Sequence, residues 1–295
     1  MPHLGRIFVR SLLALATVVS SLTALVALSA NAATSPSVAG AVTSAHWSRN
    51  VRATVGSYGT WTYRSNGLPA YGMVKYYAVP TAQSSAIPTS STSRVAPTSS
   101  IEKVQHYKFT LPLRPTYAAT STPTGRGPIG VTVNGALLFN SFEGDGTTVA
   151  LASNFSTTAN GITAPFLDAC SGHFAPSGQY HYHGLPRCIV THLKGGTRAA
   201  GGSGRPTLIG FLFDGFPVYD NVAMNGSTIS KRQLDSCNGL YSATPQFPKG
   251  IYHYVLLSAA TKYSSINCYH GVVASSYTQR PMNTLGGPEN IPLAK

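Results

Sequence analysis

An internal repeat in the middle and C-terminal parts of the 295-residue chain constrains its fold more than any other feature. Residues 129–140 and 209–220 share one pattern: Ile-Gly, three residues, Asn or Asp, Gly, two residues, an apolar residue, an aromatic residue, and Asn or Asp. An Asn-Gly or Asp-Gly pair between alternating apolar residues is the strongest short-range signal for a β-hairpin. Each segment is therefore predicted to form a tight hairpin.

A second set of matching segments follows each hairpin. The order is Leu-Asp-x-Cys-x-Gly, then Tyr-His-Tyr, then a further cysteine. These segments are residues 167–172, 180–182 and Cys188 in the first copy, and residues 234–239, 252–254 and Cys268 in the second. Two copies are too few for a solenoid, which needs about three repeats. The pattern therefore predicts one internally duplicated β-domain with pseudo-twofold symmetry.

The four cysteines are Cys170, Cys188, Cys237 and Cys268. An even number in an exported chain indicates two disulfides, for which three pairings exist. If each copy is one structural unit, Cys170 pairs with Cys188 and Cys237 with Cys268, although pairing across the copies remains open. A four-thiolate zinc site is the alternative, and the lack of any Cys-x-x-Cys pair argues against it.

The N-terminus has the pattern of a secretory signal peptide. Arg6 and Arg10 precede an apolar run over residues 11–28, and Ala-Asn-Ala follows at residues 30–32. A basic start, an apolar middle and small residues at the exit are typical of a cleaved leader, whereas a retained membrane anchor is the alternative. We expect residues 1–32 to be removed, leaving a secreted or cell-envelope protein without a membrane span.

Composition favours a mainly β, loop-rich protein, because Gly, Pro, Ser, Thr and Tyr are abundant and long helical apolar stripes are missing. The formal charge is +13, and +11 without Arg6 and Arg10. Its basic residues are scattered, so nucleic acid is not expected as a partner, whereas an anionic envelope polymer is possible. The expected organisation is an N-terminal segment over 33–60, a β-rich domain over 61–271 with a Ser/Thr/Pro-rich loop at 80–100, and a C-terminal tail over 272–295.

Tyr-His-Tyr-His at residues 180–183 is the most chemically suggestive stretch. Alternate side chains of a strand share one face, so His181 and His183 can converge on one ion or small ligand. Imidazole ligands suit copper or zinc. The same residues can instead be half-buried packing residues. The candidate metal ligands or their partners are His181, His183, His253, His173, Asp214 and Asp168.

These motifs occur in a specific order along the chain. They are Ser-Asn-Gly-Leu-Pro at 65–69, the hairpin segments, Asp-x-Cys-x-Gly-His at 168–173, Tyr-His-Tyr-His at 180–183, and the second-copy motifs up to Cys268. Over about residues 61–271 the chain resembles the secreted YHYH domain proteins, which implies an exported domain. It departs from that family at Tyr71, where a His often follows the Asn-Gly-x-Pro turn. In the second copy Val255 also replaces the second His.

Three functional interpretations follow from the residues. The first is a binding protein for a metal ion or a small polar ligand, built on the strand with paired His residues. The second is a hydrolase that acts on cell-envelope polysaccharide through an Asp-His pair. The third is a structural surface domain, so whether the protein is an enzyme is left open.

Overall fold

The computed structural model describes the greater part of one compact unit, and all statements below refer to its described residues. These are residues 35–71, 104–142, 146–147, 149–150, 156–159, 162–165, 167, 170–175, 178–194, 204–258 and 261–278. The predicted signal peptide at 1–32 and the predicted loop at 80–100 lie outside them. Within these residues, no helix has both the length and the apolar character needed to cross a membrane.

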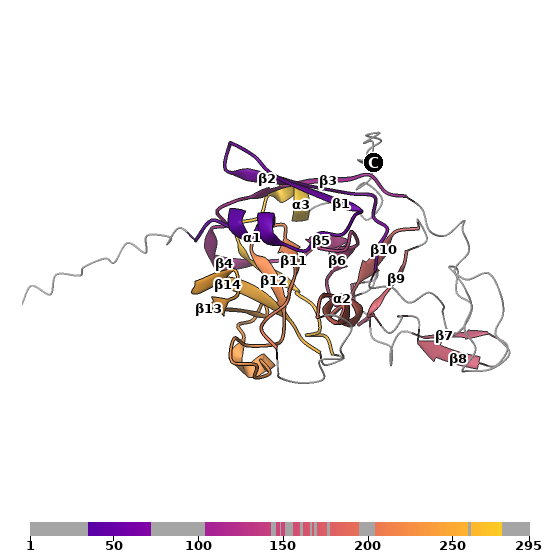
Figure 1. Ribbon diagram of the computed structural model, residues 1–295. Coiled ribbons are helices and arrows are strands. Elements are labelled where there is room, and N and C mark those ends of the chain that lie inside the picture. The colour runs from indigo at the N-terminus through magenta and orange to yellow at the C-terminus, as the bar shows by residue number, and fades with distance from the viewer. Residues whose placement is uncertain are drawn as a thin grey trace, which may run out of the picture. The chain divides into compact units, whose positions relative to one another are not determined.

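A mixed eight-stranded sheet dominates the fold, with the strand order β13-β14-β12-β11-β5-β6-β10-β9 (Figure 1). The first-copy strands are β5 (Pro128–Thr132), β6 (Leu137–Phe139), β9 (Gly172–Phe174) and β10 (Tyr180–Tyr182). The second-copy strands are β11 (Leu208–Leu212), β12 (Pro217–Asp220), β13 (Gly239–Thr244) and β14 (Phe247–Leu256). The predicted mainly β fold is confirmed.

The sheet has internal twofold pseudo-symmetry about its central strands, β5 and β11. These strands are antiparallel, and Val131 lies directly opposite Phe211. On each side, a hairpin partner (β6 or β12) follows, then a parallel strand that contains Tyr-His-Tyr, and then an antiparallel outer strand. Even the register is the same, because Tyr182 pairs with Leu138 and the equivalent Tyr254 pairs with Val218. The predicted duplication is therefore present in three dimensions.

Both hairpins turn at the glycine that the repeat places after Asn or Asp. Gly135 and Gly215 have φ values of 110° and 89°, a region that favours glycine because it has no Cβ. Asn134 and Asp214 precede these glycines, and each accepts a hydrogen bond from the backbone N–H two residues later. This Asx geometry explains why the pair Asn-Gly or Asp-Gly recurs at the two turns.

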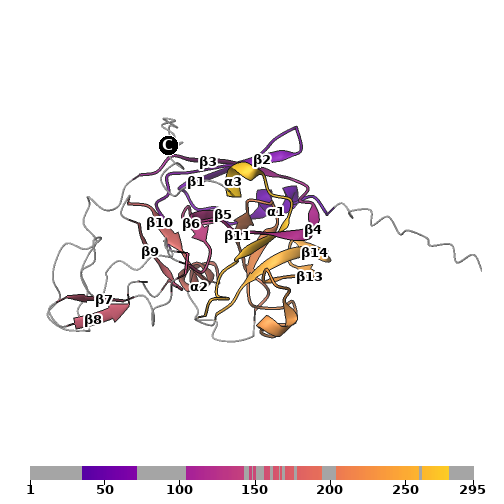
Figure 2. The ribbon, with the colours of Figure 1, turned by 180° about the vertical axis from the view of Figure 1, so that it is seen from behind.

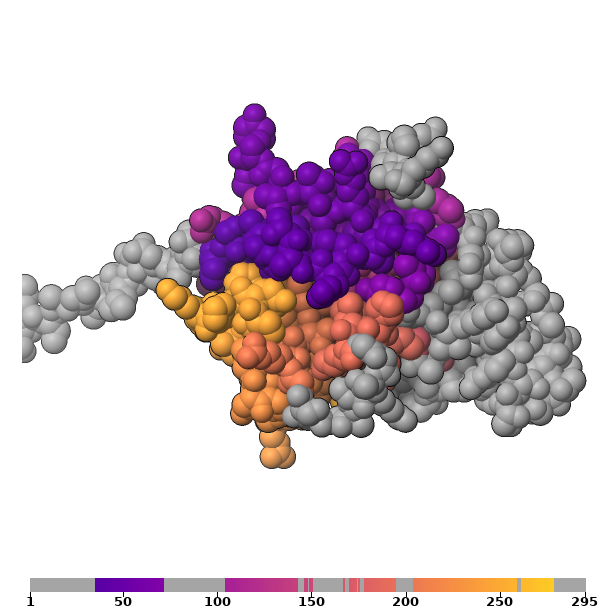
Figure 3. All heavy atoms as spheres, in the orientation of Figure 1, coloured from indigo at the N-terminus to yellow at the C-terminus, as the bar shows by residue number. Residues whose placement is uncertain are grey.

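A second layer covers the centre of the sheet. The helix α1 (Ala39–Ser44) precedes a three-stranded antiparallel sheet of β1 (Val51–Val55), β2 (Thr60–Ser65) and β3 (Tyr107–Pro112). Trp61 packs edge-on against Phe211 with ring centroids 5.1 Å apart, and the Tyr63 hydroxyl donates to the Thr132 carbonyl. Figure 3 shows this N-terminal part, in indigo and purple, against the orange second copy. Val38, Ala41 and Val42, which lie earlier in this part of the chain, are buried in the same core.

The remaining elements lie around these two layers (Figure 2). Tyr277 of the last helix stacks on Phe213 at 4.5 Å, which ties the start of the expected C-terminal tail to the core. The remaining strands are β4 (Tyr117–Pro123), which pairs with β15 (Cys268–Gly271), and β7 (Ser156–Ala159), which pairs with β8 (Ile162–Pro165). The remaining helical elements are α2 (Arg187–Leu193), the 3-10 turn η1 (Lys231–Gln233) and α3 (Ser275–Thr278).

The two disulfides join Cys170 to Cys188 and Cys237 to Cys268, which confirms the pairing within each copy. The residue after each first cysteine, Ser171 or Asn238, adopts a positive φ of 66° or 62°. Its carbonyl accepts a hydrogen bond from the residue that follows Tyr-His-Tyr in the same copy. Each disulfide therefore fixes a turn directly beside a Tyr-His-Tyr strand.

Candidate metal centre

Three histidines come together at the outer end of the first copy. His181 lies in β10 and His183 lies one residue past its end, so the alternation of a strand places them on one face. The outer strand β9 supplies His173, which lies directly opposite His181 in the antiparallel register. The predicted shared face is confirmed, and pairing of β9 with β10 adds the third imidazole.

The ring nitrogens of these histidines converge on one point. His181 Nε2 lies 2.9 Å from His183 Nε2, and His173 Nε2 lies 3.2 Å from the same atom. One nitrogen from each ring lies within 4.8 Å of the others. All three residues are buried, with at most 4 % of their surface exposed. We name this group the three-histidine cluster.

Backbone carbonyls orient two of the rings. The Asn140 carbonyl oxygen lies 2.8 Å from His183 Nδ1, and the Gln179 carbonyl oxygen lies 3.3 Å from His181 Nδ1. A carbonyl can only accept, so each contact favours a proton on Nδ1. That tautomer leaves the Nε2 lone pair directed into the cluster, which is the arrangement found in metal-ligating histidines.

The imidazoles of the cluster are neutral near pH 7. Burial lowers the pKa of His183 to about 4. Burial also lowers the pKa values of His173 and His181 well below the ordinary value, and the charge of neighbouring imidazoles adds to this effect. Neutral imidazole is the form that binds metal ions.

No neutral arrangement of protons satisfies the His181–His183 pair. With both protons on Nδ1, two Nε2 lone pairs face each other at 2.9 Å. Moving one proton to Nε2 makes that hydrogen bond but turns the Nδ1 lone pair of the same ring toward a carbonyl oxygen. A cation at the centre removes this conflict, since it accepts all the Nε2 lone pairs while both Nδ1–H groups keep their carbonyl partners.

A cavity of about 320 Å³ opens beside the cluster, and all three histidines line it. Phe139 forms part of its wall and stacks on the His181 ring with centroids 4.0 Å apart. Asn140 and Arg126 also line it. The cluster is therefore buried on the protein side and open to a cavity on the other.

His253, one of the candidate ligands predicted from the sequence, is not part of the three-histidine cluster. It lies in β14, and four strands (β12, β11, β5 and β6) separate β14 from β10 (Figures 1 and 2). Its Nδ1 lies 3.1 Å from the Ile251 carbonyl oxygen, which reproduces the contact of His181 with Gln179. His253 is thus the symmetry equivalent of His181 in the second copy.

Apolar residues replace the other two histidines of the cluster in the second copy. The register of β13 with β14 places Leu240 opposite His253, where the first copy has His173. Val255 occupies the position of His183 and packs with Ile229 and Leu257 in a small apolar cluster. Aliphatic side chains therefore occupy the two positions that carry His173 and His183 in the first copy.

Asp214 lies at a hairpin turn and not at the cluster. Its carboxylate is fully buried and accepts hydrogen bonds from the Tyr254 hydroxyl and from the backbone N–H groups of Phe216 and Gly271. Burial raises its pKa to about 7, although these hydrogen bonds oppose the shift. The first-copy equivalent, Asn134, likewise bonds the Tyr182 hydroxyl. Asp214 is therefore placed as a turn residue, and Asp168 lies outside the described residues.

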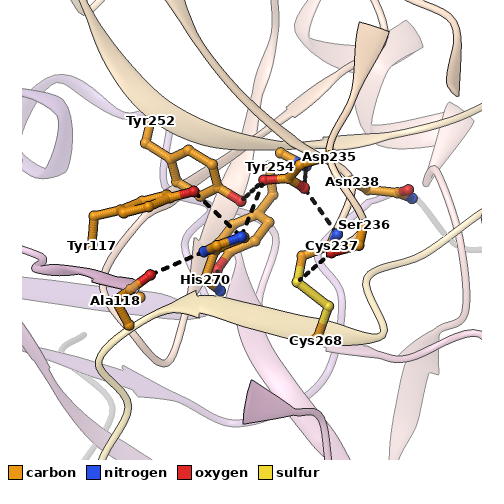
Figure 4. Close-up of polar contacts among 12 residues, drawn as sticks. Tyr117, Ala118, Asp235, Ser236, Cys237, Asn238, Tyr252, Tyr254, Cys268 and His270 are labelled. Carbon is orange, nitrogen blue, oxygen red and sulfur yellow. Dashed lines mark hydrogen bonds and ion pairs between the residues drawn. A yellow bond between two sulfur atoms is a disulfide. The ribbon is translucent and has the colours of Figure 1, made fainter. Parts of the chain in front are cut away.

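The second copy contains an Asp-His contact of another kind (Figure 4). Asp235 accepts hydrogen bonds from the Tyr252 hydroxyl and from the backbone N–H groups of Cys237 and Gly239. His270 Nε2 lies 3.9 Å from the Asp235 carboxylate, and its ring stacks on Tyr117 at 4.5 Å. These contacts link residues on either side of the Cys237–Cys268 disulfide.

The sequence placed both His173 and His253 among the candidate ligands, and of these two His173 lies in the three-histidine cluster. The available signal was the repeat itself. Aligning Leu-Asp-x-Cys-x-Gly in the two copies places His173 opposite Leu240, which marks the first copy alone as rich in His. The carbonyls of Asn140 and Gln179 that orient the rings could not be predicted from the repeat, because every residue has a backbone carbonyl whatever its side chain.

Comparison with known proteins gives one match. The family model described as YHYH protein matches residues 108–233, a span that contains the three-histidine cluster, the first disulfide and both hairpins. It ends before β13 and β14, which carry the second Tyr-His-Tyr. Comparison with curated proteins and with solved structures found no match. Residues 108–233 therefore match the YHYH family, which supports the resemblance that the sequence motifs indicate.

Proposed function

We propose that the protein binds a copper or zinc ion through His173, His181 and His183. The observation that carries this proposal is the convergence of the three rings in a buried, neutral cluster, with His183 Nε2 at 2.9 and 3.2 Å from the other two Nε2 atoms. Two nitrogens that each lie about 2.1 Å from one ion are about 3.0–3.4 Å apart for bond angles between 90° and tetrahedral. The separations of 2.9 and 3.2 Å are close to this range.

The donor set favours a borderline transition metal. Imidazole nitrogens suit copper and zinc, whereas calcium and magnesium require oxygen ligands. All four cysteines are in disulfides, so none offers a thiolate. Among the residues that the structure describes, no carboxylate belongs to the ligand group. A metal centre of three imidazoles with an open position is the arrangement used in several binding and catalytic zinc proteins.

We further propose that the metal is bound outside the cytoplasm. The leader-like N-terminus supports export, and the two disulfides are consistent with an oxidising compartment. The basic charge of the chain would favour association with an anionic polymer of the cell envelope. Such an association would concentrate the protein near its source of metal.

Metal content measured on purified variants tests the proposal. The wild-type protein, incubated with copper or zinc and dialysed, is expected to retain about one equivalent of metal. Loss of an outer-shell partner alone typically weakens metal binding about 10- to 100-fold. Loss of a direct ligand in His183→Ala should exceed that and abolish retention.

His253→Ala is the matched control, because His253 is equally buried and occupies the equivalent strand of the second copy. It should keep the full equivalent of metal. A wild-type protein that retains no metal, or a His183→Ala variant that retains as much as the wild type, would contradict the proposal.

A further inference from the structure

The cavity beside the three-histidine cluster has room for more than water. Its volume of about 320 Å³ is at the lower end of the range for small-molecule sites, which is about 300–1,000 Å³. Since the three ligand rings form part of its wall, an ion bound by them would face this space. The fourth coordination position is therefore accessible to a ligand that does not come from the three rings.

Charge balance restricts what that ligand can be. Three neutral imidazoles leave the whole charge of a divalent ion uncompensated in a buried site. A buried ion without a compensating partner is costly, because the surrounding protein solvates charge poorly. The described part of the ligand group contains no Asp, Glu or Cys thiolate that could supply the missing negative charge. An anionic fourth ligand would supply it.

The described cavity walls suit a small organic anion. Phe139 and Phe142 provide aromatic surface, and Asn140 and Asn267 provide amide groups. Arg126 also lines the cavity, and its planar guanidinium matches the geometry of a carboxylate. A pocket that combines apolar walls with a few polar groups binds ligands whose polar end is held in a defined orientation.

We propose that this centre is an exchangeable site at which a small carboxylate completes the coordination of the metal from the cavity, beside Arg126. The inference rests on the metal-binding function proposed above. The metal keeps its three imidazole ligands throughout, and the carboxylate replaces water or hydroxide at the remaining position. The ligand class is thus a monocarboxylate of few carbon atoms.

Anion titrations of the copper-loaded full-length protein test this proposal. Acetate and azide are expected to change the visible and electron paramagnetic resonance spectra of the bound copper in a saturable way. Acetamide, which has the shape of acetate without its charge, should leave both spectra unchanged. Copper content measured in the same samples separates the two proposals. Protein that retains neither copper nor zinc would overturn the metal function, whereas copper-loaded protein that ignores both anions would overturn only the present inference.

Two variants locate the anion in this cavity. Ala175→Leu adds volume at a lining residue, and it should weaken acetate binding about tenfold or more, a change of about 1.4 kcal/mol. Ala119→Leu, at an exposed position of β4, is its matched control and should bind acetate as the wild type does. Arg126→Gln, which leaves the cavity volume nearly unchanged, should also weaken acetate binding. Unaltered acetate affinity in both Ala175→Leu and Arg126→Gln would place the anion elsewhere and overturn the inference.

Discussion

At the scale of single residues, hydrogen bonds to the backbone determine the chemistry of the cluster. The carbonyls of Asn140 and Gln179 hold the Nδ1 sides of His183 and His181, which directs both Nε2 atoms to one point. Burial then keeps the rings neutral at physiological pH. The geometry and protonation of the three rings would thus both be set before an ion binds, and preorganisation of this kind favours tight binding.

Asp214 offers a residue-scale prediction about pH. Burial raises its pKa from 3.8 to about 7, so between these values the folded state binds the proton more tightly than the unfolded state. The stabilisation is fully present below about pH 4 and is lost as pH rises through 7, with a slope of up to about 1.4 kcal/mol per pH unit. Asp214→Asn, which copies Asn134 of the first copy, should remove this dependence.

Urea unfolding of both proteins between pH 4.5 and 8 measures the effect. The free energy of unfolding of the wild type, relative to Asp214→Asn, should fall by about 2–4 kcal/mol across that interval. The buried histidines titrate in both proteins, and their contribution therefore cancels in the difference. Parallel curves for the two proteins would show that Asp214 does not titrate in this range.

At the scale of elements, each copy is a disulfide-linked unit around a Tyr-His-Tyr strand. In both copies the second tyrosine bonds the Asn or Asp of its hairpin turn: Tyr182 with Asn134, and Tyr254 with Asp214. The face that carries the tyrosines therefore holds the strand to the hairpin, while the opposite face carries the histidine. Residues on the histidine face can therefore differ between the copies while the tyrosine on the other face keeps its hydrogen bond to the hairpin turn.

The two disulfides should differ in their effect on metal binding. Cys170 lies three residues before His173, so the Cys170–Cys188 bond restrains the start of the strand that carries a ligand. Replacing Cys170 and Cys188 with serine should lower both stability and metal affinity. Replacing Cys237 and Cys268 with serine should lower stability alone, because that bond lies in the second copy.

Each replacement is expected to cost about 3–4 kcal/mol of stability, since the bonds close loops with sequence separations of 18 and 31 residues. Chemical denaturation and competition with a metal chelator measure the two quantities separately. Equal losses of metal affinity in the two disulfide variants would show that the local restraint at His173 is unimportant.

At the scale of the whole molecule, one duplicated architecture supports two different outer ends. The first ends in three histidines and a cavity, and the second ends in Leu240 and Val255 packed in an apolar cluster. The shared registers show that the fold does not need the histidines at those positions. The metal-binding function proposed above would account for their presence in the first copy.

The double variant His173→Leu, His183→Val makes the first copy resemble the second. It should fold and bind no metal. Without metal it should be at least as stable as the wild type, with a gain on the order of 1–2 kcal/mol, because it replaces two buried polar rings with the aliphatic side chains that occupy the same positions in the second copy. Thermal unfolding in the presence of a chelator measures this. A loss of several kcal/mol would instead indicate that these histidines are packing residues.

Local pattern and repetition predicted much of this structure. Asn-Gly and Asp-Gly located both hairpins, alternation placed His181 and His183 on one face, and duplication indicated the disulfide pairing. The order of the strands could not be predicted this way, because pairing of β5 with β11 joins residues about 80 positions apart. That order determines which histidines meet, and it separates His253 from His181. The contact of Trp61 with Phe211 could not be predicted either, because these two residues also lie far apart in the sequence.

X-ray absorption spectroscopy of the metal-loaded protein tests the central claim most directly, because it counts and identifies the atoms around the ion. The account predicts three imidazole nitrogens at about 2.0–2.1 Å and one further oxygen or nitrogen ligand, with no sulfur. The spectrum of His253→Ala should be identical to that of the wild type. A first shell made mainly of oxygen, or a shell with fewer than three imidazoles in the wild type, would contradict the three-histidine site.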